Sequence, residues 1–78
     1  MAEFKTHSMA GAAYAVANGK RIVRCDRVDE RRCVFVFDEP VAALVQEYFR
    51  GGEVPATLFF DAIIELRTQV NRALRGAR

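Results

Sequence analysis

The sequence predicts an α+β fold in one domain, residues 1–78, with elements in the order strand, helix, strand, strand, helix, helix. Residues 21–38 contain two runs rich in Val, Ile, Phe and Cys around the charged turn Asp29-Glu30-Arg31, which is typical of a β-hairpin. Residues 41–50 and 56–75 repeat apolar side chains at helical spacing. The 78-residue length suits one small domain. We expect a small antiparallel sheet with the hairpin at its centre and the helices packed on it.

The pairing of the hairpin follows from the alternation of its side chains. A three-residue loop over residues 29–31 gives these opposed pairs: Val28 with Arg32, Cys25 with Phe35, and Val23 with Phe37. One face then carries the core residues Val23, Cys25, Cys33, Phe35 and Phe37. A two-residue loop would oppose Arg24 to Phe35 and break that face, because a shift of one residue turns every side chain to the other side. The longer loop requires Arg31 to adopt the left-handed conformation that Gly or Asn prefers.

Start and stop residues bound the remaining elements. Residues 3–6 are predicted to add a strand to the hairpin. A first helix, residues 8–17, begins at a Thr6 or Ser8 cap, ends at Asn18-Gly19, and is expected to lie flat on the sheet. A second helix over residues 41–50 starts after Asp38-Glu39-Pro40, where carboxylates favour the positive end of the helix dipole. The third helix covers residues 56–75.

The third helix carries more apolar surface than one core face requires. At 100° per residue, one arc of about 160° holds most of its apolar side chains. These are Leu58, Phe59, Ala62, Ile63, Leu66, Val70, Ala73 and Leu74. Phe60 and Ile64 lie outside the arc, so either the second helix covers them or they contact a second molecule. Arg67 and Asn71 continue the line of Phe60 and Ile64, so these four residues are the predicted protein interface, with a homodimer as the expected assembly and another protein as the alternative partner.

Charge is distributed unevenly along the chain. Residues 20–32 hold six basic and three acidic groups, residues 33–65 one basic and six acidic, and residues 66–78 four basic and none acidic. Arg24, Arg27, Arg31 and Arg32 are the candidate contacts to nucleic acid, since guanidinium groups bind phosphate bidentately. Because three carboxylates offset half of the hairpin charge, we expect such binding to be weak. A ribbon-helix-helix reading is not favoured, because Val34 and Val36 could not hydrogen-bond base edges.

No motif in the sequence carries catalytic chemistry. His7 is the only histidine and has no nucleophile or carboxylate arranged beside it in the sequence. Cys25 and Cys33 are predicted to be buried free thiols, because their spacing fits neither a disulfide framework nor a zinc site. The Ala-rich stretch before residue 18 is too short for a membrane span and a poor match to a signal peptide. We expect no enzyme activity, cofactor or metal, and a cytoplasmic protein without membrane association.

Three stretches together resemble a known family. They are FKT, AAY and NG within residues 4–19, CVFVF at 33–37, and EYFRGGEVPATLFFDAIIEL at 47–66. The chain resembles an uncharacterised family of short bacterial and phage proteins that is classed only as a domain of unknown function. The resemblance implies a cytoplasmic protein carried partly on mobile elements, and it supplies no catalytic residue, cofactor or ligand. The expected function is a self-associating protein-interaction module, with an inhibitor of a host complex as one specific form and a weak nucleic-acid-binding accessory protein as the alternative.

Overall fold

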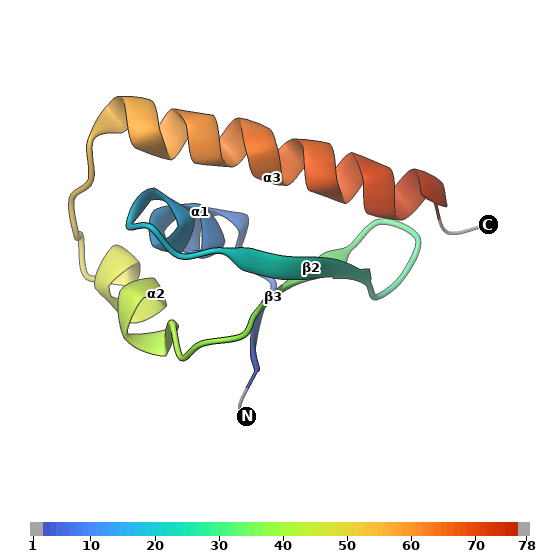
Figure 1. Cartoon of the computed structure of the whole chain (residues 1–78), viewed down its shortest axis with the longest axis horizontal. Coiled ribbons are helices and arrows are strands. Elements are labelled where there is room, and N and C mark those ends of the chain that lie inside the picture. Colours follow the sequence, from blue (N-terminus) through green and yellow to red (C-terminus); the bar gives the residue numbers. More distant parts are fainter. Residues whose placement is uncertain (1–2, 77–78) are drawn as a thin grey trace.

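The computed structural model describes residues 3–76 and contains the six predicted elements in the predicted order. They are β1 (Phe4–Thr6), α1 (Met9–Ala17), β2 (Ile22–Arg27), β3 (Cys33–Phe37), α2 (Ala42–Phe49) and α3 (Ala56–Gly76). The three strands form one antiparallel sheet in the order β1-β3-β2, so β3 is central. Figure 1 shows α1 and α3 on one side of this sheet, with α3 running along the length of the molecule. The α+β class is therefore confirmed.

The hairpin has the predicted register except at its open end. Cys25 pairs with Phe35, as the alternation of side chains predicts. A bulge between Ile22 and Arg24 then leaves Val23 as an extra residue, and Ile22 instead of Val23 pairs with Phe37. The prediction that Val23 lies in the core is wrong, because the bulge turns its side chain outward, where it is 49% exposed. Ile22 takes its place and packs against the core.

Asp29 holds the hairpin turn together. The backbone N–H of Val28 donates to the carbonyl of Arg32, which confirms this predicted pair. No residue other than glycine has a positive φ within residues 3–76, so the left-handed conformation predicted for Arg31 is wrong. Instead, Asp29 Oδ1 accepts hydrogen bonds from the backbone N–H groups of Arg31 and Arg32, each at 2.9 Å. An aspartate that bonds to the backbone two residues on can close a turn without left-handed geometry.

Charged side chains cover the sheet face opposite α1 and α3. Val36 is fully buried on that face, opposite Lys5 of β1 and Arg24 of β2. The Arg24 guanidinium bonds to Glu3, just before β1, and to Asp26 of β2, each at 2.9 Å. Because β1 and β2 are the two outer strands, the Arg24–Glu3 ion pair spans the central strand above Val36. The aliphatic part of the arginine can then shield the valine while its charge stays in water.

The first helix lies between the other two helices instead of flat on the sheet. Ser8 caps it by accepting a hydrogen bond from the Gly11 N–H at 2.9 Å, and Gly19 follows its end with φ of 91°. Residues 11–15 are buried on all sides of α1, which contacts α3 and α2 more extensively than it contacts the sheet. A Cβ atom on Gly11 would lie 3.0 Å from Cγ1 of Val45 in α2. Small residues in α1 thus allow α2 and α3 to approach it closely.

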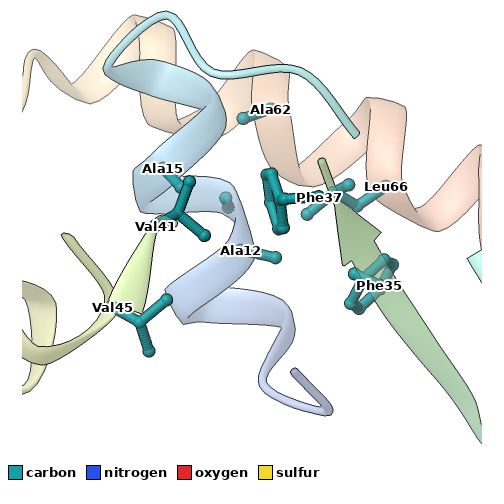
Figure 2. Close-up of a cluster of buried hydrophobic side chains, with 9 residues drawn as sticks. Ala12, Ala15, Phe35, Phe37, Val41, Val45, Ala62 and Leu66 are labelled. Carbon is teal, nitrogen blue, oxygen red and sulfur yellow. The ribbon is translucent and has the colours of Figure 1, made fainter. Parts of the chain in front are cut away.

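Aromatic side chains of β3 meet α1 and α3 in the core. Figure 2 shows Phe37 of β3 beside Leu66 and Ala62 of α3 and facing Ala12 of α1. Of the arc predicted on α3, Ala62 and Leu66 are fully or almost fully buried, and Phe59, Ile63 and Val70 pack against the core at its edge. Leu58 is 48% exposed, so its predicted place in the core is wrong. It lies in the first turn of α3, before the buried centre at Ala62 and Leu66.

The start of α2 differs slightly from the prediction. The helix begins at Ala42, its N-cap is Val41, and its first turn contains no acidic residue. Glu39 instead forms an ion pair with Lys20, with 3.2 Å between Nζ and Oε1. This ion pair links the segment before α2 to the segment before β2.

Candidate interaction surface

The predicted ridge on α3 is exposed. The side chains of Phe60 and Ile64 are 64% and 48% exposed, and they lie one turn apart on α3, outside its buried side. The alternative that α2 covers them is therefore wrong for this chain. Two large apolar side chains with this much exposure on one helix are a feature of interaction surfaces.

A shallow hollow lies beside the ridge, over the first two turns of α3. Its volume is about 520 Å³, and it is lined by Ala56, Thr57, Phe59, Phe60, Asp61 and Ile63. Most of this lining is apolar, with Asp61 as its only charged group. A protruding apolar side chain of a partner would fit such a hollow, which is how buried anchors bind at protein interfaces.

Polar residues continue the ridge toward the carboxyl end of α3. Arg67 and Asn71 are exposed, and their side chains make no hydrogen bond or ion pair within residues 3–76. Together with Phe60 and Ile64 they form a continuous line along α3, which we call the α3 ridge. These four residues are the predicted interface. An apolar centre with a polar border is the usual composition of a protein interface.

An aromatic cluster that sequence reasoning missed lies next to the α3 ridge and is formed by side chains of α1, α2 and α3. Tyr48 of α2 stacks on Phe59 of α3 with ring centroids 6.3 Å apart, and it contacts Tyr14 of α1 with centroids 6.0 Å apart. Phe49 follows Tyr48 at the end of α2 and is 68% exposed. The helical repeat of Val41, Leu44, Val45 and Tyr48 accounts for the buried side of α2 and leaves Phe49 outside it. The position of Phe49 outside this repeat was the sequence feature that could have indicated the cluster.

The four candidate arginines of the hairpin are largely engaged within the chain. Arg24 binds Glu3 and Asp26, and this raises its pKa because both carboxylates stabilise the charged guanidinium. The Nε–H of Arg32 donates to Asp29 Oδ2 at 2.8 Å, and that of Arg27 donates to the Asp29 carbonyl at 2.9 Å. The backbone N–H of Arg31 and the guanidinium of Arg32 both lower the pKa of Asp29. The turn is therefore a mixture of positive and negative groups.

The two cysteines and the histidine form no catalytic or metal-binding arrangement within residues 3–76. Cys33 is buried and Cys25 is partly buried, and both are free thiols. Burial, with Cys33 as its close neighbour, raises the pKa of Cys25 to about 12, so its thiol stays protonated and is a poor nucleophile at neutral pH. Within residues 3–76, no three His, Cys, Asp or Glu side chains form a group that could hold a metal ion. His7 is exposed just before α1.

No protein-family model, curated protein or solved structure matches the chain. In the part of the chain that the structure describes, no helix is long and apolar enough to cross a membrane.

Proposed function

We propose that the chain is a small, non-catalytic protein-interaction module that self-associates through the α3 ridge. The observation that carries this proposal is the exposure of Phe60 and Ile64 on the outer side of α3. A chain of 78 residues has a thin core, so burial of these side chains in a dimer would add stability that one copy lacks.

The expected affinity is modest. Full burial of one large apolar side chain contributes about 1.5–3 kcal/mol. Because Phe60 and Ile64 are already partly covered, burying both in each of two copies contributes on the order of 5 kcal/mol. This is near the lower end of the free energy that association costs. Contacts beside the ridge must add to it, and the dimer should dissociate on dilution.

Analytical ultracentrifugation with matched variants tests the proposal. Phe60→Glu should give a monomer at concentrations where the wild type is a dimer, because a dimer would bury an unpaired carboxylate. It should also remove the increase of melting temperature with protein concentration that a dimer produces. Leu58→Glu is the matched control, since it places the same charge on an exposed apolar position of the same helix but off the ridge.

Two results would overturn self-association. One is a wild type that remains monomeric at high micromolar concentration. The other is an equal loss of dimer in Leu58→Glu and Phe60→Glu. If the wild type is monomeric, the α3 ridge becomes a docking surface for a different protein, such as the target of a phage-type inhibitor.

A further inference from the structure

The two halves of α3 carry opposite charge. Asp61 and Glu65 are the ionisable residues of residues 56–66, and Arg67, Arg72 and Arg75 are those of residues 67–76. All five are exposed, and none forms an ion pair within residues 3–76. This charge therefore remains available to a partner.

The pattern distinguishes between two ways of pairing α3 with a second α3. In a parallel pair, acidic halves would lie beside acidic halves and basic halves beside basic halves. In an antiparallel pair, acidic residues of each helix approach basic residues of the other. With the pair centred on Ile64, Asp61 of one copy lies level with Arg67 of the other, and Glu65 lies about 100° round the helix from Ile64, at the edge of the contact. Opposite charges across an interface favour association and determine its orientation. The helix is complementary to itself only when reversed.

We propose that two copies of the chain pair their α3 helices antiparallel, with a two-fold axis close to Ile64. This proposal rests on the proposed self-association through the α3 ridge and specifies its geometry. Ile64 of one copy then contacts Ile64 of the other, since a residue on the axis meets its own mate. Residues equally far from Ile64 on opposite sides become neighbours, so Thr57 meets Asn71 across the interface.

The arrangement also gives Phe60 and Arg67 a shared role. On a helix with 100° per residue they lie about 20° apart, on the same side of the line through Ile64. A two-fold axis perpendicular to both helices places this side of each helix on the same side of the dimer. Phe60 of one copy therefore lies beside Arg67 of the other, where a guanidinium can cover the face of an aromatic ring. The hollow beside Phe60 leaves room for the approaching side chain.

Disulfide crosslinking tests the orientation directly. Thr57→Cys and Asn71→Cys are made in separate chains, one of which carries a mass tag, and each is oxidised alone and as a mixture. Thr57 and its mate would be 14 residues apart along an antiparallel pair, or about 21 Å at 1.5 Å per residue, as would Asn71 and its mate. A disulfide requires Cα atoms within about 7 Å. We expect a crosslink only in the mixture, between tagged and untagged chains.

The controls separate the possible failures. Wild type, with only Cys25 and Cys33, should give no crosslink, because one thiol is buried and the other is held protonated. Self-crosslinking of Thr57→Cys alone and of Asn71→Cys alone, in variants that sediment as dimers, would refute the antiparallel orientation and leave the proposed function intact. Monomeric sedimentation of both the variants and the wild type would instead refute the proposed function.

Charge reversal supplies a second test that needs no cysteine. Asp61→Arg with Glu65→Arg makes both halves of α3 basic and should weaken the dimer at least tenfold at low salt. Adding Arg67→Glu and Arg72→Glu to the same chain makes the carboxyl half of α3 net acidic, with Arg75 unchanged. It should recover the part of the affinity lost to charge repulsion, but not the contact of Arg67 with Phe60. In a parallel pair the first change would only replace one like-charge contact by another. An unchanged dissociation constant in the doubly substituted chain would therefore overturn the proposal.

Discussion

The Tyr14 hydroxyl of α1 donates a hydrogen bond to the Glu47 carboxylate of α2. Tyr14 is 1% exposed and Glu47 is exposed, so this bond joins the buried helix α1 to the surface of α2. The hydrogen bond that the hydroxyl donates to the carboxylate, together with burial, raises the pKa of Tyr14. Gly52, which follows α2, lies against the same pair. A Cβ atom there would be 2.5 Å from the Tyr14 hydroxyl and 2.9 Å from the Glu47 carbonyl oxygen.

Gly52→Ala is therefore expected to destabilise the fold by about 1–3 kcal/mol through overpacking. In a Tyr14→Phe background the same change should cost less, because the hydroxyl that meets the new methyl group is absent. Urea denaturation of the wild type, the two single variants and the double variant gives the coupling between the sites. An equal cost of Gly52→Ala in both backgrounds would show that Tyr14 is not the limiting contact.

The hairpin shows how far alternation of side chains predicts pairing. The pairing of Cys25 with Phe35 follows from polarity, because an apolar face is lost in any other register. The bulge at Val23 leaves no such signal, since Ile22 and Val23 are both β-branched and apolar and either could face the core. Contacts of the preceding segment, such as the Lys20–Glu39 ion pair, are formed in three dimensions and have no counterpart in strand periodicity.

Phe37 and Val23 provide a matched test of this difference. Phe37 is fully buried, and Phe37→Ala should cost about 3–5 kcal/mol, enough to unfold much of a domain this small. Val23→Ala should change stability by no more than about 0.5 kcal/mol, because the bulge leaves this side chain half exposed. Thermal and urea unfolding of both variants measure the effects. If Val23→Ala were as unstable as Phe37→Ala, the result would contradict the bulge and favour the regular pairing of Val23 with Phe37 that alternation predicts.

The α3 ridge was predictable from the sequence because all of its residues lie on one helix. Helical periodicity alone separates Phe60 and Ile64 from the buried side of α3, because all four residues of the ridge belong to that helix. Whether α2 covered the ridge could not be predicted, since this depends on how two helices pack. The stack of Tyr48 on Phe59 likewise joins residues 11 positions apart and requires the three-dimensional structure.

The ion pair between Arg24 and Glu3 should make stability depend on pH in the acid range. The hydrogen bond from Arg24 lowers the pKa of Glu3 from its ordinary value of 4.5. A carboxylate with a lowered pKa stabilises the fold above its unfolded-state pKa, and this contribution is lost as the pH falls through the folded-state pKa. Arg24→Gln should therefore be less stable than the wild type at pH 7, and the difference should shrink as the pH falls below about 4.5.

Urea midpoints measured across the acid range check this expectation, with Arg21→Gln as the control. Arg21 is exposed and forms no ion pair within residues 3–76, so its variant should follow the wild-type curve. A constant difference between Arg24→Gln and the wild type at every pH would mean that Arg24 acts by packing over Val36 and not through Glu3.

Nucleic-acid binding is expected to be weak and without sequence preference. Arg24 and Arg32 are paired with carboxylates, so binding a phosphate would require each to give up an existing partner. Arg31 has no side-chain ion pair in the described part of the chain, so Arg31→Gln should reduce residual binding more than Arg24→Gln. Fluorescence anisotropy with a labelled mixed-sequence duplex measures both variants at low salt. The affinity should fall steeply as salt is added, because each phosphate contact releases a counterion. Sequence-selective nanomolar binding at about 150 mM salt would contradict this expectation and favour a nucleic-acid-binding protein over a self-associating module.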